Sequence, residues 1–461
     1  STLSPSSAAS DVYKRQVCKF GGTALSDAQN VKKVVKIIKS NKARRFIVVS
    51  AMGKAYVKDR KVTDVLNDCF CELNETGGMK SWEFVERKYV ALADSLQASL
   101  DMRSLVASVR EEIMTNPSRD FIMSRGEYLS ARLLSALLDF RYVEAADVVR
   151  FFRDGALNVP ESEKLLAQEA LVCKKGCVMG GFYGSDGSRI VTFPRGGSDI
   201  SGALAAAALD AEIYENWTDV SGILMADPRI VDDPDTIERI TYNELRELSY
   251  MGAQVLHEGA VFPVREKNIP LNIRNTNEPD HPGTLIMERF ADEEISDRFI
   301  TGIAGRKNFS IITVSKAGMS SQMGSLRQML EVFEKHGVCV EYTPSGIDSV
   351  SFVVAADKAK DRIYSIVGEI RDALSPDNIQ ITGGISVVAA VGRQMAFKPG
   401  TSGRIFAALG KAGINIRMIS QGPDELNIIV GVNNDDFESC VRVLYNLSLI
   451  HISEPTRHLR I

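Results

Sequence analysis

The sequence predicts an α/β protein in which a mostly parallel sheet flanked by helices is followed by two small β-α-β-β units. Three observations predict this fold. The first half alternates short β-branched runs, such as RFIVVSAM and RIVTF, with longer helical patterns. The Pro/Asn-rich segment NTNEPDHPGTLI, at 275–286, then marks a domain boundary. Two segments of similar pattern follow it, and such repetition indicates duplicated small domains.

We expect three domains, because 461 residues are too many for one hydrophobic core. The boundaries suggested by the pattern are 17–290 for the large domain, and 298–374 and 383–447 for the two small ones. The two ends, 1–16 and 447–461, break the apolar periodicity of their neighbours. We expect these ends to be disordered or foreign to the natural protein.

Composition excludes several classes of partner. The chain carries 55 Lys+Arg against 59 Asp+Glu, a net charge of −4, so bulk charge gives no reason to expect nucleic acid or an anionic membrane. No apolar run is long enough to span a bilayer. The seven cysteines form no C-x-x-C pair and the five histidines no H-E-x-x-H motif, so we expect no protein-built metal site. A cytoplasmic location fits this cysteine usage.

The first stretch that could carry chemistry is VCKFGGT, at 17–23. It lacks the usual phosphate-loop pattern, because Lys19 precedes the glycines. A lysine at a strand end can direct its ammonium at a phosphoryl group, while Gly21 and Gly22 let backbone N–H groups approach the anion. A plain turn after a strand would explain the glycines equally well.

A helix is expected to follow these glycines. Ser26 and Gln29 form a capping-box signature that places its start. Its apolar face would comprise Val31, Val34, Val35 and Ile38. Lys32, Lys33, Lys36 and Lys39 lie off that face, and the simplest account of them is a solvated surface.

Three further stretches combine a helix or strand end with polar residues. In SRGEYLSARLLSALLDF, at 124–140, leucines at helical spacing form core, and Glu127 falls in the expected first turn, where a helix dipole favours a carboxylate. In FPRGGSDISGALAAAALDA, at 193–211, Arg195, Ser198 and Asp199 surround a helix start, which is a ready anion site. Asp199 could equally cap that helix. The strand in IYENWTDVSGILMADPRIV, at 213–231, ends in polar loop residues, where α/β proteins bind ligands.

Taken together, these motifs resemble an aspartokinase of the amino acid kinase fold. The resemblance rests on KFGGT, VVSAMG followed by Thr63, SRGEYLSARLL, RGGSD, WTDVSGILMADPR and MGAQVLH, in this order, and it covers roughly residues 17–446. The two C-terminal units are similar to ACT domains. The resemblance implies a three-layer α/β/α kinase domain followed by two ferredoxin-like βαββαβ domains.

The resemblance also implies an activity: transfer of the γ-phosphoryl of MgATP to the side-chain carboxylate of L-aspartate, the first step of lysine, threonine and methionine biosynthesis. It assigns catalysis to Lys19 and Asp199. It assigns substrate binding to Thr63, Glu127, Arg195 and Ser198. The nucleotide contacts it implies are Lys19, Phe20, Gly21, Gly22, Thr218, Asp219, Leu224, Arg229, Gln254 and Val255.

Two departures from the family pattern are visible. Ala24 stands where a serine is common, and Gln254 replaces a lysine assigned to nucleotide binding, which puts one ATP contact in doubt. His257, in the same motif, is expected to be structural.

The ACT resemblance implies regulation by an amino acid, with lysine the expected effector and threonine the second choice. The implied effector contacts are Met319, Gly324, Ser325, Leu326, Val340 and Glu341, although Met319 and Leu326 could equally be core. Pairing of these domains implies a homodimer or a higher homo-oligomer. Two other readings stay open: a kinase for another amino-acid carboxylate, and a catalytically impaired amino-acid sensor.

Overall fold

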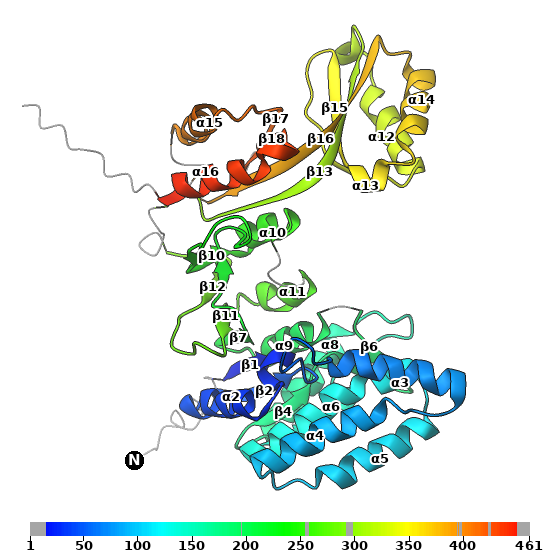
Figure 1. Cartoon of the computed structure of the whole chain (residues 1–461), viewed down its shortest axis with the longest axis vertical. Helices are drawn as coiled ribbons and strands as arrows, with labels where there is room; N and C mark the ends of the chain where they lie inside the picture. Colours follow the sequence, from blue (N-terminus) through cyan, green and yellow to red (C-terminus); the bar gives the residue numbers. More distant parts are fainter. Residues whose placement is uncertain are drawn as a thin grey trace, which may run out of the picture. The chain divides into compact units, whose positions relative to one another are not determined.

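The computed structural model describes residues 15–194, 196–253, 258–291, 298–393, 395, 399–422 and 426–449. Within them the chain forms two compact units (Figure 1). The first unit comprises 15–223, 238–242 and the described residues up to 290. The second comprises 224–237, 243–253 and the described residues from 291 onward. Within these residues no helix is both long and apolar enough to cross a membrane.

The first unit is built on an eight-stranded sheet with the order β10-β12-β11-β7-β1-β2-β4-β3. Its neighbouring strands run parallel except β11 and β12. The strands are β1 (Gln16–Phe20), β2 (Arg44–Val49), β3 (Arg141–Val143), β4 (Cys177–Gly180), β7 (Ile213–Thr218), β10 (Arg239–Thr241), β11 (Leu271–Asn275) and β12 (Thr284–Met287). Two short strand pairs lie outside this sheet. Strand β5 (Tyr183–Ser185) pairs antiparallel with β6 (Ile190–Thr192) in the first unit, and β8 (Ile223–Leu224) pairs with β9 (Thr236–Ile237), which belongs to the second unit.

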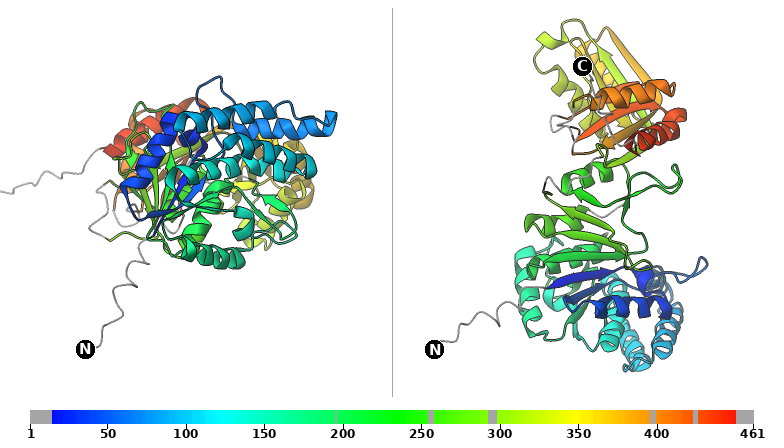
Figure 2. Two further views of the ribbon diagram at one scale, coloured as in Figure 1. Left: turned by 90° about the horizontal axis from the view of Figure 1, so that it is seen from below. Right: turned by 90° about the vertical axis from the view of Figure 1, so that its left-hand side faces the viewer.

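Helices cover both faces of this sheet (Figure 2). One face packs Cys18, Phe20 and Trp217 into a core with five helices: α2 (Ala28–Ser40), α3 (Val62–Thr76), α4 (Trp82–Leu96), α5 (Met102–Thr115) and α6 (Arg119–Leu138). The other carries α8 (Val159–Val172), α9 (Gly197–Ala208) and α11 (Glu258–Glu266), with the short α7 (Ala145–Val148) beside α8. The predicted three-layer α/β/α arrangement is confirmed.

Helix α2 begins one residue later than the capping-box signature predicts. Asp27, not Ser26, is the N-cap, and its carboxylate accepts a hydrogen bond of 2.9 Å from the backbone N–H of Asn30. The single 3-10 turn η1 (Gly22–Leu25) occupies the space after the glycines. The buried face also differs slightly from the predicted one: the buried positions are Val31, Val34, Ile37 and Ile38, and Val35 is only partly buried.

The second unit contains a six-stranded antiparallel sheet with the order β14-β15-β13-β16-β18-β17. Its strands are β13 (Gly302–Ser315), β14 (Val340–Tyr342), β15 (Ser349–Ala355), β16 (Asn378–Val391), β17 (Met418–Ser420) and β18 (Asn427–Asn433). Its helices are α10 (Tyr242–Tyr250), α12 (Ser325–Lys335), α13 (Ala356–Ala359), α14 (Ile363–Leu374), α15 (Thr401–Lys411) and α16 (Phe437–Leu449), with the 3-10 turns η3 (Met319–Ser321) and η5 (Asn434–Asp436).

The two predicted repeats are visible as β13-α12-β14-β15 and β16-α15-β17-β18. They share one sheet, because β13 and β16 are each 14 residues long and pair with each other from Gly302 to Ser315. At the two ends of the chain, β1 already begins at Gln16 and α16 continues to Leu449. The rest of both predicted tails lies outside the described residues.

Candidate active site

The centre of the site is a buried ion pair between the first strand and a helix start. Lys19 lies on β1 and is 8% exposed, and its Nζ atom is 2.6 Å from Oδ1 of Asp199. Asp199 lies in the first turn of α9, but the N-cap of that helix is Gly196, which makes no side-chain cap. The carboxylate therefore faces the lysine, and the capping alternative for Asp199 is wrong.

The glycine loop beside Lys19 needs its glycines because a second backbone segment approaches it closely. A Cβ added at Gly22 would lie 2.6 Å from the carbonyl oxygen of Ala51, and one added at Gly53 would lie 2.7 Å from the backbone of Gly22. The N–H of Gly53 donates to the carbonyl oxygen of Gly22 at 2.8 Å. The N–H of Gly21 is also used within the fold, because it donates to the carbonyl oxygen of Trp217 at 3.2 Å. The contact of Gly21 with a phosphate stays a prediction, and in this conformation its N–H is already used within the fold.

Glu127 lies in the middle of α6 and not in its first turn, because the helix already begins at Arg119 with Ser118 as N-cap. The helix dipole therefore does not explain this carboxylate. Glu127 is 3% exposed, and its Oε2 atom is buried without a hydrogen-bond partner among the described residues. Burial raises the pKa of Glu127 to about 8, although backbone N–H groups, including that of Ala51, act in the opposite direction.

The other residues expected to bind substrate fall at two helix starts. Thr63 is partly buried in the first turn of α3, and Ser198 is partly buried in the first turn of α9. Ser198 lies against Gly181, where an added Cβ would come 2.7 Å from its Cα. Arg195 lies outside the described residues.

The residues expected to bind the nucleotide are divided. Phe20 is fully buried with its ring stacked on Trp217 at a centroid distance of 5.9 Å, so its side chain belongs to the core. Thr218 ends β7 and donates to Asp219 at 3.2 Å. Leu224 and Arg229 belong to the second unit, where Arg229 pairs with Asp227 at 2.6 Å. Gln254, Val255 and the neighbouring His257 lie outside the described residues.

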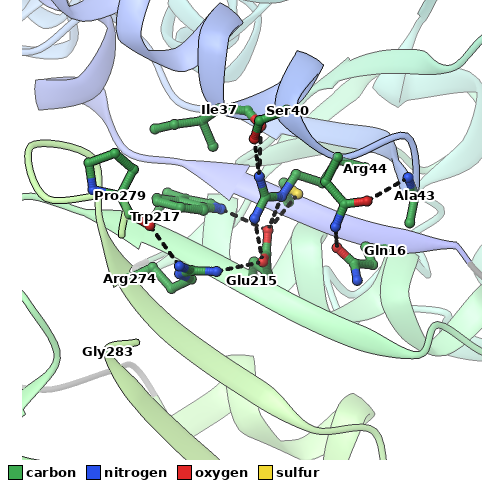
Figure 3. A network of polar contacts seen from close by, with 12 residues as sticks. Gln16, Ile37, Ser40, Ala43, Arg44, Glu215, Trp217, Arg274, Pro279 and Gly283 are labelled. Carbon is green, nitrogen blue, oxygen red and sulfur yellow. Dashed lines mark hydrogen bonds and ion pairs between the residues drawn. The ribbon is translucent and has the colours of Figure 1, made fainter. Parts of the chain in front are cut away.

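The strand that ends at Thr218 is anchored from its other face by a buried charge network (Figure 3). Both oxygens of Glu215 accept from the guanidinium of Arg44, at 2.7 and 2.9 Å. Trp217 donates its ring N–H to Glu215 at 3.0 Å, and the guanidinium of Arg274 donates to Glu215 at 3.3 Å. Burial would raise the pKa of Glu215, but the Arg44 hydrogen bond and charge outweigh it and leave that pKa lowered.

Comparison with known proteins extends these observations. A model of the amino acid kinase family matches residues 14–275, and a model of the ACT domain matches 388–447. Aspartokinase 3 of Bacillus subtilis is 33% identical over 456 residues, covering 93% of this chain and 98% of the relative. The chain belongs to the aspartokinase family. The predictions of fold class, family and enzyme class are confirmed.

Solved structures of aspartokinases agree with this assignment. The crystal structure of Clostridium acetobutylicum aspartate kinase, described as an allosteric enzyme, is 42% identical with a TM-score of 0.85, covering 94% of this chain and 99% of that one. Escherichia coli aspartokinase III in complex with aspartate and ADP is 25% identical with a TM-score of 0.69, at 94% and 99% coverage. The chain is therefore an aspartate kinase of amino-acid biosynthesis, regulated allosterically through its ACT domains.

In this aspartokinase the residues expected to contact an effector lie around the start of α12 and on β14. Met319 packs in the core beneath them, and Ser325 is buried with its hydroxyl donating to the carbonyl oxygen of Gln322. Leu326 is 45% exposed. Glu341 already has partners within the same unit: the Tyr250 hydroxyl donates to it, and Arg306 lies 3.6 Å away.

Two parts of the aspartokinase site were not found by sequence reasoning. Lys88 pairs with Asp59 at 2.7 Å and donates to the carbonyl oxygen of Gly53 at 2.8 Å, which fixes the loop next to Gly22. Asn216, on β7, donates to Asp199 at 3.0 Å. The only local signal for the second was an amide side chain within the strand YENWT, where an apolar residue would be expected.

Proposed function

We propose that Lys19 neutralises the γ-phosphoryl group of ATP as it passes to the side-chain carboxylate of L-aspartate, and that Asp199 holds its ammonium in place. The single observation that supports these roles is the buried 2.6 Å ion pair beside the glycine loop. Neutralising charge that develops in the transition state is the main requirement of phosphoryl transfer.

No general base is needed for the nucleophile. An aspartate side chain with an ordinary pKa of about 3.9 is already ionised at neutral pH. The chain's own residues therefore bind, orient and neutralise. The backbone at Gly22 packs directly against that at Gly53, so neither position can carry a side chain, and this packing holds the loop next to Lys19 in one place.

We assign recognition of the substrate's α-ammonium to Glu127. Its buried Oε2 atom has no partner among the described residues, and a buried unpaired carboxylate oxygen is costly unless a ligand satisfies it. Arg195 would pair with the α-carboxylate, since a guanidinium grips a carboxylate through two hydrogen bonds. Thr63 and Ser198, both at helix starts, would add hydrogen bonds.

ATP is the expected phosphoryl donor, and Thr218, Asp219, Leu224 and Arg229 are the proposed nucleotide contacts, with Gln254 and Val255 beyond the described residues. Mg²⁺ fits a site of this kind because it usually binds substrate phosphates, water and one or two carboxylates. Within the described residues no group of three His, Cys, Asp or Glu could hold a metal by itself. The ion would therefore be held mainly by the nucleotide, and it would neutralise phosphate charge. We place the reaction in the cytoplasm.

We propose lysine as the feedback effector, bound near Glu341 at the edge of the first ACT-like repeat of a homodimer or higher homo-oligomer. The supporting observation is chemical: Glu341 offers a carboxylate on β14, and lysine carries a second ammonium that threonine lacks.

The test is ATP-dependent formation of acyl phosphate, trapped with hydroxylamine. Aspartate, glutamate and acetylglutamate are compared in parallel, each with and without lysine or threonine. We expect signal with aspartate alone, suppressed by lysine. Signal with another acid would refute the substrate assignment, and suppression by threonine alone would refute the effector assignment.

A further inference from the structure

Asn216 occupies a position that the reaction scheme above does not use. It lies on β7, and the parallel register of β7 with β1 places it directly beside Lys19. Side chains of paired positions on neighbouring strands project from the same face of a sheet. The face in question is the one that carries α9, because the alternate residues Glu215 and Trp217 belong to the buried network on the opposite face.

The polar contacts of Asn216 are unusual for a buried amide. The residue is 4% exposed, and its Nδ2 donates to Oδ1 of Asp199, the same oxygen that Lys19 contacts. Its own Oδ1 is buried and has no hydrogen-bond partner among the described residues. An unpaired buried carbonyl oxygen destabilises the fold, so a packing role alone does not account for an amide here.

We propose that Asn216 is a positioning residue for phosphoryl transfer. Its amide fixes the carboxylate of Asp199. The fixed carboxylate in turn holds the ammonium of Lys19 at a defined starting position, from which it turns toward the phosphoryl group. Its unpaired Oδ1 is an acceptor, on the strand beside Lys19, that the ammonium can use during that movement. The inference rests on the proposed roles of Lys19 and Asp199.

The test compares Asn216→Leu, which removes the amide at similar volume, with Asn272→Leu. Asn272 is a matched control because its Oδ1 is also buried and unpaired, while its register with Glu215 places it on the opposite face of the sheet. We expect Asn216→Leu to lower kcat by about 10- to 100-fold, since a hydrogen bond to a charged group is lost. The KM for aspartate and the affinity for ADP should stay within about threefold of the wild type. The control variant should keep kcat.

A pH profile separates positioning from packing. Asn216→Asp preserves shape but introduces a carboxyl group next to Asp199, and two carboxyl groups sharing a site raise one pKa. When protonated, the introduced group can donate to Asp199 as the amide does. We therefore expect kcat of Asn216→Asp at saturating substrates to be near that of the wild type at pH 6 and to fall as the pH rises. This profile decides the question even if Asn216→Leu folds poorly.

Lys19→Met, measured in the same assay, distinguishes the proposed function of the Lys19–Asp199 pair from the positioning role of Asn216. If Lys19→Met keeps its kcat, the proposed function of the pair is wrong. If Lys19→Met is inactive while Asn216→Leu retains full kcat, or if Asn216→Asp loses kcat equally at every pH, only the positioning role is wrong.

Discussion

The Nζ atom of Lys19 and the Oδ1 atom of Asp199 lie 2.6 Å apart, although the residues come from a strand near the start of the chain and from the first turn of α9. Both side chains are mostly shielded from water, with 11% and 20% of their surface exposed. An ion pair in such surroundings is stronger than one on the surface, and each partner fixes the other.

Replacing Lys19 should therefore remove most of the activity. We expect Lys19→Met to lower kcat by about 10² to 10³-fold, the usual cost of losing one group that stabilises a developing charge. Hydroxylamine-trapped acyl phosphate measures this directly. Lys36→Met, which changes an exposed lysine on α2, is the control and should leave kcat unchanged. Equal activity in the two variants would contradict the assignment.

The protonation of Glu127 should control substrate binding. Its pKa of about 8 means that the free enzyme holds a neutral carboxyl at pH 7, which cannot pair with the aspartate ammonium. We expect kcat/KM for aspartate to rise about tenfold per pH unit below pH 8 and then to level off. Glu127→Gln should raise KM and remove this slope. A flat profile in the unmodified enzyme would show that Glu127 does not titrate.

The same pKa has a consequence for stability. Because the folded-state pKa lies above the ordinary value of 4.5, the folded chain retains a proton that the unfolded chain releases. The stability contributed by this proton is complete below the unfolded pKa and is lost as the pH rises through about 8. Glu127→Gln should therefore lose less thermal stability between pH 5 and pH 9 than the unmodified protein, as measured by thermal unfolding.

Gly22 should not tolerate a side chain. An added Cβ would lie 2.6 Å from the carbonyl oxygen of Ala51, a backbone atom that cannot move aside by rotation. We expect Gly22→Ala to destabilise the protein by about 1–3 kcal/mol and to raise the KM for ATP by about tenfold. Gly403→Ala is the matched change in α15, where an added Cβ meets nothing within 4 Å. It should be neutral or stabilising.

The contact between Tyr250 and Glu341 should oppose effector binding. An effector ammonium that pairs with Glu341 must compete with the Tyr250 hydroxyl. We expect Tyr250→Phe to lower the lysine concentration needed for half inhibition by several-fold, up to about tenfold, because a hydrogen bond to a charged group is worth about 1.5 kcal/mol or more. Tyr364→Phe, at an exposed tyrosine on α14, serves as control. Unchanged inhibition in both variants would remove Glu341 from the effector site.

Removing a single partner of Glu215 from its buried network should destabilise the folded protein. Arg44→Met leaves a buried carboxylate without its main partner, and we expect a loss of about 3–5 kcal/mol. The double change Arg44→Met with Glu215→Leu should recover part of that loss, because the unpaired buried carboxylate is removed. The recovery should be incomplete, because Arg274 loses its ion pair with Glu215 and keeps only its hydrogen bonds to the carbonyl oxygens of Pro279 and His281. Urea unfolding followed by tryptophan fluorescence reports on this region, since Trp217 belongs to the network.

Sequence reasoning found what local patterns encode. Lys19 before two glycines and Asp199 in a helix start were visible because strand ends and helix starts leave short-range signals. Glu127 was placed in the wrong part of its helix because Ser124 and Ser118 are both plausible caps, and only tertiary packing shows that the helix begins at the earlier one. Asn216 was missed because its role depends on the register between β1 and β7, which no local pattern records.

The two long strands β13 and β16 have a consequence for how the regulatory half could have evolved. Strand β13 pairs with β15 on one side and with β16 along nearly all its length on the other, so the two ACT-like repeats share one sheet although α13 and α14 connect them in the chain. Loss of either repeat would expose an open sheet edge on the other. The two repeats therefore depend on each other for a complete sheet, and we expect neither to persist without the other.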